Sequence, residues 1–144
     1  MRNRFPIAVH LFFLEDDQIL LLRRFNTGYE DGKYSIVAGH LEAGETVTQA
    51  AAREAQEEAG VLIRPEDVQV VHVMNRKSND ERVDFFVLIK AWEGKIQNTE
   101  PDKCDDLAWF PLADLPDNMI PYVRFAIGNY QEGLLYSEFG WLGA

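Results

Sequence analysis

Three glutamates in one short segment carry the strongest chemical signal in this sequence. On an α-helix of about 3.6 residues per turn, Glu54, Glu57 and Glu58 share one face. Carboxylates one turn apart repel each other, and Arg53 would relieve part of that repulsion, chiefly through Glu57. A hard divalent cation such as Mg²⁺ would relieve the rest by binding the oxygens. For a bare Glu-x-x-Glu-Glu pattern, however, a solvated acidic helix face is the more common explanation.

The residues around these glutamates predict the helix that positions them. Thr46 and Gln49 fit a capping box, alanines are frequent in the stretch that follows, and Gly60 supplies a C-terminal stop. The helix face opposite the glutamates is small, so we expect it to lie close against a sheet. The loop 39–45 precedes the helix, and its glycines allow bends that would place a carbonyl beside a metal.

With these flanks, the segment from Gly39 to Val61 resembles the signature of the Nudix hydrolases. The family's fixed positions are occupied at the right spacing by Gly39, Glu45, Arg53, Glu54, Glu57, Glu58, Gly60 and Val61. Three departures are Ala55, smaller than the usual aliphatic residue, and Val37 and Ala38, where the family often has a proline and a glycine. None of them removes a carboxylate.

The resemblance implies a metal site and a base. Glu54, Glu57 and Glu58 would bind Mg²⁺, with Mn²⁺ as the alternative ion, and the carbonyl of Gly39 would be a further ligand. Glu54 would also accept a proton from the water that attacks phosphorus. The implied reaction is hydrolysis of a phosphoanhydride bond without a covalent enzyme intermediate.

Other motif residues would support this site. Arg53 would orient the glutamates and so belong to the catalytic group with Glu54 and Glu57. Glu45 would brace the loop and the helix through Arg53, which is a structural role, and the role of Gly60 is structural as well.

One further metal ligand is expected from a later loop. Glu100 follows Trp92 by eight residues, and MutT-type members of the family have a metal-binding glutamate at the same spacing. Glu100 is therefore the first candidate for this ligand. Glu93 and Asp102 are the alternatives, and an ordinary exposed loop acid is an equally good explanation for Glu100.

Four residues are candidates for substrate contact. Arg23 and Arg24 end an apolar run where MutT-type members have a phosphate-facing arginine, and only one of two neighbouring strand residues can face a cleft. Asn118 stands in a loop resembling one that presents an asparagine to the base, although a turn asparagine is the more common case. His40 flanks the expected cleft, and a solvated histidine is the simpler interpretation.

Substrate identity is less well indicated. The segment 75–79 contains neither the proline typical of ADP-ribose hydrolases nor the tyrosine typical of dinucleotide hydrolases. This favours a nucleoside triphosphate, such as an oxidised purine or a pyrimidine nucleotide. The alternatives are ADP-ribose, a nucleotide sugar or a dinucleotide, and a nucleotide-sensing or protein-binding module of the same fold without turnover.

Charge and composition limit the partners. The 144 residues carry a net charge of -10, from 14 basic and 24 acidic residues, which argues against binding of a nucleic acid polymer. A small nucleotide substrate remains compatible with this charge if a cation bridges it to the carboxylates.

The single cysteine, Cys104, indicates a reducing, cytoplasmic location and is expected to be partly buried. No stretch is long and apolar enough to span a membrane, and a homodimer is an open alternative to a monomer.

Strands before, around and after the helix predict a mixed α/β or α+β fold. The resemblance specifies it as a Nudix-like α/β/α sandwich with a mixed β-sheet, in a single domain spanning residues 1–144. His10 and His72 lie in strand patterns and are interpreted as ordinary packing residues. The strand at 83–92 is nearly all apolar and is expected to be central. Strands are predicted at 7–14, 19–22, 34–38, 68–74, 83–92 and 108–110, with a second helix at 120–131.

Overall fold

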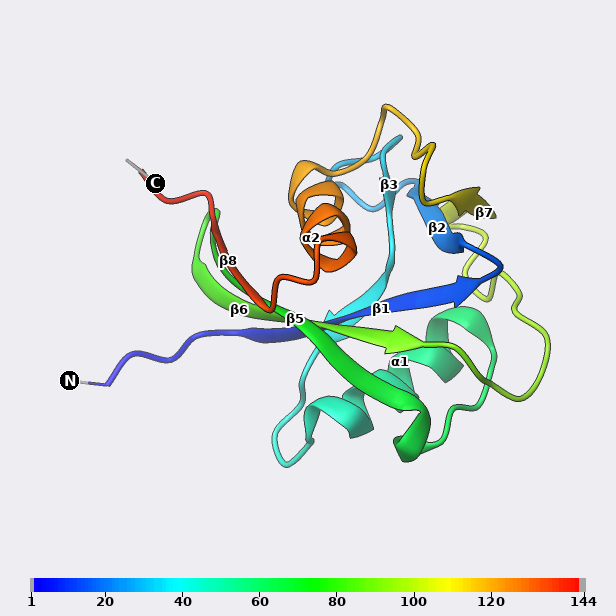
Figure 1. Cartoon of the computed structure of the whole chain (residues 1–144), viewed down its shortest axis with the longest axis horizontal. Helices are drawn as coiled ribbons and strands as arrows, with labels where there is room; N and C mark the ends of the chain where they lie inside the picture. The colour runs from blue at the N-terminus through cyan, green and yellow to red at the C-terminus, as the bar shows by residue number, and fades with distance from the viewer. Residues whose placement is uncertain (1, 143–144) are drawn as a thin grey trace.

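The computed structural model describes residues 2–142 and has two α-helices packed on a mixed β-sheet (Figure 1). Within these residues no helix is long and apolar enough to cross a bilayer. In chain order the elements are β1 (Ile7–Glu15), β2 (Gln18–Arg24), β3 (Tyr34–Ser35), β4 (Val37–His40), α1 (Val47–Ala59), a 3-10 turn η1 (Pro65–Asp67), β5 (Val68–Lys77), β6 (Glu81–Ile89), β7 (Cys104–Pro111), α2 (Pro121–Gln131) and β8 (Tyr136–Phe139).

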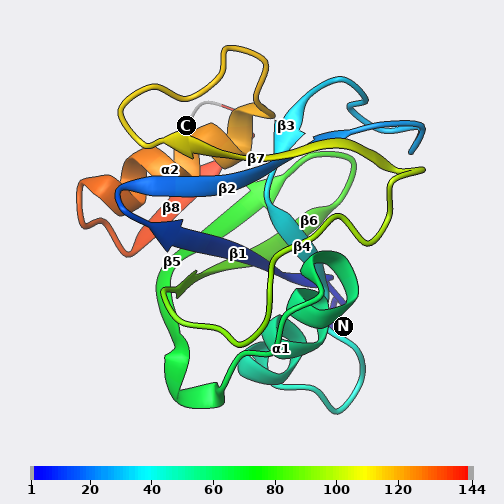
Figure 2. The same ribbon diagram turned by 90° about the vertical axis from the view of Figure 1, so that its right-hand side faces the viewer.

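The sheet order is β3-β2-β1-β6-β5-β8, with β4 also pairing with β1 and β7 with β2. The pairs β1–β6 and β5–β8 are parallel and the others antiparallel, so the sheet is mixed. The two helices lie on opposite sides of β1, as Figures 1 and 2 show. The predicted α/β/α sandwich is confirmed, and β6 is central, as expected.

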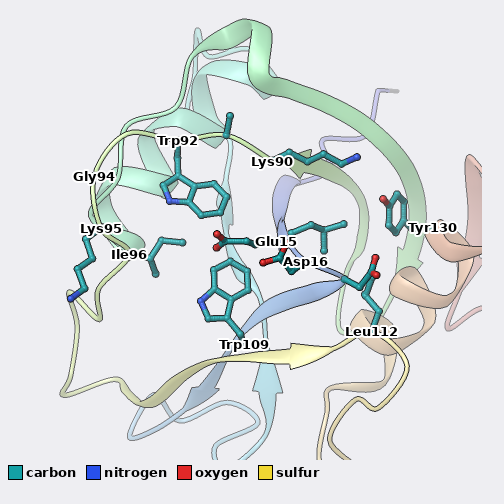
Figure 3. Close-up of a pocket in the computed structure, with 13 residues that line it drawn as sticks. Glu15, Asp16, Lys90, Trp92, Gly94, Lys95, Ile96, Trp109, Leu112 and Tyr130 are labelled. Carbon is teal, nitrogen blue, oxygen red and sulfur yellow. The ribbon is translucent and has the colours of Figure 1, made fainter.

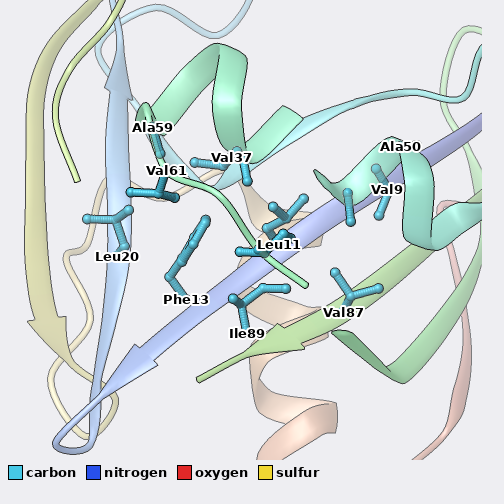
Figure 4. Close-up of a cluster of buried hydrophobic side chains, with 13 residues drawn as sticks. Val9, Leu11, Phe13, Leu20, Val37, Ala50, Ala59, Val61, Val87 and Ile89 are labelled. Carbon is cyan, nitrogen blue, oxygen red and sulfur yellow. The ribbon is translucent and has the colours of Figure 1, made fainter. Parts of the chain in front are cut away.

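Alternation along β1 divides the core between the two helices. Val9, Leu11 and Phe13 pack on the α1 side, whereas Phe12 packs on the α2 side. Figure 4 shows the first group meeting α1 through small side chains. The alanines of that helix face, Ala50, Ala51, Ala55 and Ala59, are fully buried, so the expected close approach of helix and sheet is confirmed.

Both ends of α1 are made as the sequence predicts. The Gln49 amide donates to Oγ1 of Thr46 at 3.1 Å, and the Thr46 amide donates to Oε1 of Gln49 at 2.9 Å. Gly60 closes the helix in the left-handed conformation at φ 70°. These local bonds determine where the helix begins and ends, and hence which residues share its faces.

Several predicted boundaries are wrong. The strand expected at 34–38 breaks at Ile36, because β3 pairs with β2 whereas β4 pairs with β1. Gly39 and His40 belong to β4 rather than to a loop. The expected strand 83–92 ends at Ile89, and β8 was not predicted, because a short edge strand of mixed polarity has little apolar pattern to reveal it.

The two buried histidines do more than pack. Nε2 of His10 lies 3.0 Å from Oδ1 of Asp84, and Nε of Arg76 donates to the other oxygen at 2.6 Å. The Arg76 guanidinium lies 3.7 Å from the ring centroid of Tyr122 on α2. Burial would raise the pKa of Asp84, but the hydrogen bonds from His10 and Arg76 hold it at about 2. His72 also bonds through both ring nitrogens. Both histidines are buried and contact Phe86, so the expected packing role is confirmed, with hydrogen bonds in addition.

Candidate active site

Arg53 is the centre of a charged network at the start of α1. Its guanidinium donates to both carboxylate oxygens of Glu45, from Nε at 2.7 Å and from Nη2 at 2.9 Å. Nη1 donates to Glu54 at 2.6 Å and to Glu57 at 3.3 Å. The expectation that Arg53 pairs chiefly with Glu57 is wrong, because the loop brings Glu45 to the guanidinium in a bidentate geometry that an exposed neighbour on the helix does not match.

The hydrogen bonds from Arg53 lower the pKa of Glu45 to about 2. In return, the bond to Glu45 raises the pKa of Arg53, so this pair stays charged over the whole working range of pH. The same arginine also donates to the carbonyl of His40 at 2.9 Å. Arg53 therefore joins the loop, β4 and α1 in one arrangement.

Glu54 lies against the backbone of β4. A Cβ atom added to Gly39 would lie only 2.0 Å from Oε1 of Glu54, so any side chain at position 39 would displace this carboxylate. The glycine is therefore required for close approach rather than for the backbone bend that we expected, and the bend is made by Gly44 at φ 83°. Burial raises the pKa of Glu54, against the hydrogen bond from Arg53.

Glu58 enters the same region from one turn further along α1. Its Oε2 accepts a hydrogen bond from the Ala38 amide at 3.1 Å. Burial raises the pKa of Glu58 to about 8, and the nearby charges of Glu54 and Glu100 act in the same direction. Arg24 opposes the shift only weakly.

A cleft of about 550 Å³ lies beside this carboxylate. Glu58, Glu100 and Arg24 all contribute to its lining. The two alternative loop acids do not line it, and Glu93 pairs with Arg64 at 3.2 Å instead. Of the three loop acids, the structure thus brings Glu100 to the cleft.

The two neighbouring arginines of β2 face different ways. Arg24 lines the cleft, whereas Arg23 donates to Asp105 at 2.7 Å and lies over the ring of Tyr34, 5.7 Å from its centroid. The alternation of a strand makes this separation necessary. Sequence reasoning left the choice open, and the structure places Arg24 in the cleft.

The other two substrate candidates lie outside the cleft lining. The side chain of His40 is exposed, and its carbonyl serves Arg53. Asn118 donates from its side-chain amide to the Gly32 carbonyl at 2.9 Å, which ties the loop before α2 to the loop before β3. Both residues therefore have local structural contacts.

Thr27 and Asn98 line the cleft and were not singled out from the sequence. Asn98 holds the loop that carries Glu100, accepting from the Glu100 amide at 3.1 Å and donating to the Cys104 carbonyl at 2.7 Å. In the sequence, the only indication for Thr27 and Asn98 was that both are residue types common in turns. Cys104 is buried, as expected, and burial raises the pKa of its thiol.

The donor set suits a hard divalent cation. Carboxylate oxygens of Glu54 and Glu58 lie beside the backbone of β4, at a point that the missing side chain of Gly39 leaves open. Glu57 is more exposed, at 56% of its side chain. Within residues 2–142 no three His, Cys, Asp or Glu side chains converge closely enough to hold a metal ion as they stand. Arg53 and the Ala38 amide bond to two of these carboxylates instead.

A larger cleft of about 1040 Å³ lies elsewhere on the molecule (Figure 3). Trp92 and Trp109 form its aromatic wall with ring centroids 6.0 Å apart, and Glu15 and Lys90 also contribute. It shares no lining residue with the smaller cleft and contains none of the motif carboxylates. The larger cleft is thus not the one that the motif carboxylate Glu58 lines.

Comparison with known proteins agrees with this geometry. Residues 4–126 match the family model of the NUDIX domain. The chain is 31% identical over 120 residues to the 8-oxo-dGTP diphosphatase of Escherichia coli, a match that covers 83% of this chain and 89% of that protein. It is 29% identical to a human 8-oxo-dGDP phosphatase over 80% of this chain, but the match spans only 35% of the human protein.

Among solved structures, the crystal structure of a MutT Nudix hydrolase from Burkholderia pseudomallei is similar over most of the fold. The TM-score is 0.79 at 26% identity, and the match covers 88% of this chain and 98% of that one. The two proteins thus share the fold over most of their lengths.

Proposed function

This chain belongs to the Nudix hydrolase family, and from that premise we propose that it hydrolyses a phosphoanhydride bond of a nucleoside triphosphate. The family generally uses divalent metal cations. We propose Mg²⁺ for this chain, with Mn²⁺ as the alternative, because carboxylates are the ligands that Mg²⁺ prefers and because it commonly bridges them to phosphates.

One observation carries the proposal. The cleft is lined both by acidic groups, Glu58 and Glu100, and by basic groups, Arg24 and Lys103. A cation on the acidic side and a phosphate chain between that cation and Arg24 would satisfy both sets of charges. The volume of about 550 Å³ suits a small ligand rather than a polymer.

The residues of the chain have separate tasks in the proposed reaction. Arg24 would bind non-bridging phosphate oxygens through its forked donors. Arg53 would hold Glu54, and Glu54 would take a proton from water as the water oxygen bonds to phosphorus and the anhydride P–O bond breaks. A bound Mg²⁺ would supply charge neutralisation and lower the pKa of that water. Glu54, Glu57, Glu58, Glu100 and the carbonyl of Gly39 are the proposed ligands.

The proposed substrate is an oxidised purine or a pyrimidine nucleotide. The likeness to a bacterial protein named as an 8-oxo-dGTP diphosphatase supports the first of these. Hydrolysis of ADP-ribose, a nucleotide sugar or a dinucleotide is an alternative that uses the same chemistry. A nucleotide-sensing module that hydrolyses nothing is the second alternative.

A cytoplasmic location and a homodimer remain predictions.

The test is a screen of Mg²⁺-dependent hydrolysis over nucleoside triphosphates, 8-oxo-dGTP, ADP-ribose and dinucleotides. We expect a nucleoside monophosphate and pyrophosphate as products. Two monophosphate-type products from a dinucleotide would favour the alternative, and no release from any of these compounds would favour a binding module.

Variants of the carboxylates test the assignment within the same screen. We expect Glu54→Gln to lower kcat by about 10²- to 10⁴-fold, as the loss of a general base does, with the fold intact by circular dichroism. Glu100→Gln should lower activity whereas Glu93→Gln, the matched loop acid outside the cleft, should not. Full activity in both Glu54→Gln and Glu57→Gln would overturn the assignment.

A further inference from the structure

The loop between β2 and β3 holds the guanidinium of Arg24 from two sides. Nε donates to the Tyr29 carbonyl at 2.6 Å, and Nη2 donates to Oγ1 of Thr27 at 3.1 Å. The guanidinium carbon also lies 5.2 Å from the ring centroid of Tyr29. The fork of Arg24 is thus oriented by the chain itself, at the edge of the cleft.

The partners of Arg24 are all neutral. Within residues 2–142 it forms no salt bridge, and Nη1 has no hydrogen-bond partner. Its neighbour Arg23 is different, because Asp105 neutralises that guanidinium at 2.7 Å. Arg24 therefore keeps both its charge and free donors for an anion, while the loop restricts the directions in which they point.

Asp31 organises this loop. Its carboxylate accepts from the Thr27 hydroxyl at 2.5 Å, from the Thr27 amide at 3.1 Å and from the Gly28 amide at 2.9 Å. Asn26 at φ 55° and Glu30 at φ 52° adopt the left-handed conformation, which non-glycine residues rarely do. A loop with two such residues needs side-chain bonds to maintain its path, and Asp31 supplies them.

We propose that Asp31 is a positioning residue, which acts through the Thr27 hydroxyl to keep Arg24 aimed into the cleft beside Glu58. This inference rests on the proposed function, because the task assigned to Arg24 is the binding of substrate phosphate. An arginine that is held in place before binding loses less rotamer freedom when phosphate arrives. Loss of Asp31 therefore weakens binding while the carboxylates of α1 stay where they are.

Kinetics of 8-oxo-dGTP hydrolysis at saturating Mg²⁺ test the proposal. Asp31→Ala is expected to raise KM by about 5- to 10-fold, corresponding to one side chain that must be ordered on binding, with a smaller change in kcat. Thr27→Val should act in the same direction, whereas Thr27→Ser, which retains the hydroxyl, should behave as the wild type. Asp105→Ala is the matched control, because it releases Arg23 and leaves Arg24 held.

A double variant separates positioning from general damage to the fold. If Asp31 acts through Arg24, then Asp31→Ala has no further effect on KM in an Arg24→Ala background. Additive effects would overturn the proposal. So would a folded Asp31→Ala protein with the KM of the wild type.

Nuclear magnetic resonance gives a readout that needs no turnover. The Nε–H resonance of Arg24, assigned by its loss in Arg24→Lys, should be protected from exchange in the wild type and lose that protection in Asp31→Ala. If the wild type hydrolyses no phosphoanhydride, the proposed function fails. The positioning of Arg24 by Asp31 is then still decided by this resonance, and unchanged protection in Asp31→Ala would refute it.

Discussion

Two acids on opposite faces of the sheet, Asp84 fully buried and Glu58 partly buried, illustrate how differently one fold treats a carboxylate. On the α2 side, Asp84 is fully buried between a histidine and an arginine, and its pKa is held at about 2. On the α1 side, Glu58 has one amide donor and faces Glu54 and Glu100, and its pKa rises to about 8. Asp84 is removed from water completely and Glu58 in part, but only the first has its charge compensated within the chain.

This difference in charge compensation separates an acid that has a structural role from one that could bind a ligand. A compensated charge such as Asp84 maintains a fixed contact between strands and needs nothing from solution. An uncompensated group such as Glu58 costs stability unless something arrives to neutralise it. Clusters of the second kind are where cation and substrate sites are found, although perturbed pKa values occur in purely structural networks as well.

The largest effect on stability is expected from breaking the compensated site. Asp84→Asn removes the charge that pairs with Arg76 and leaves that guanidinium buried, so the free energy of unfolding should fall by about 3–5 kcal/mol. Urea denaturation measures this free energy of unfolding. Glu58→Gln is the matched control and should cost no stability near pH 7, because a neutral amide replaces a carboxyl group whose raised pKa keeps it mostly protonated there. Equal losses in the two variants would contradict the comparison.

The same control variant should lose activity. Glu58→Gln removes a proposed ligand, so kcat/KM with 8-oxo-dGTP should fall by about 100-fold, equivalent to about 2.7 kcal/mol. Steady-state kinetics at several Mg²⁺ concentrations measure the loss. Gln56→Ala, an exposed change on the same helix, should leave kcat/KM unaltered. Wild-type activity in Glu58→Gln would remove this residue from the site.

The effect that is smallest for a single step, of one pH unit, is a dependence of stability on pH in the absence of divalent ions. The folded pKa of Glu58, about 8, exceeds its ordinary value of 4.5, so between these values the folded protein binds more protons than the unfolded chain. Stability should therefore fall as pH rises through this window, by at most about 1.4 kcal/mol per pH unit for one group. Asp84 contributes nothing here, because its window lies below pH 4.

Thermal unfolding at pH 5, 6, 7 and 8 checks this slope. Glu58→Gln should flatten it, and Mg²⁺ at pH 8 should restore stability to the wild type. A slope that neither the variant nor Mg²⁺ changes would mean that other groups determine it.

Prediction from sequence succeeded where the information is local. The bounds of α1 follow from Thr46, Gln49 and Gly60, each acting within a few residues, and the buried alanine face follows from helical spacing. Strand boundaries were less accurate because strands are completed by distant partners. Nothing between residues 34 and 40 indicates that the chain changes partners at Ile36, from β2 to β1.

The candidate site, too, was predictable from the sequence only where its residues lie close together along the chain. Spacing along one helix, with the family signature, was enough to name Glu54, Glu57 and Glu58 as a group. The bidentate grip of Arg53 on Glu45 and the contact of Gly39 with Glu54 join different elements, and their geometry required the fold.

The sequence by itself determined the family and the helix that carries the glutamates, because these depend on spacing within one short segment. Only the tertiary structure decided which arginine of β2 enters the cleft, which loop acid faces it and which buried carboxylate is neutralised by its neighbours. The physical reason is that a charge is compensated through space. Residues such as Asp84 and Arg76, or Arg24 and Glu58, interact only after strands and helices have packed.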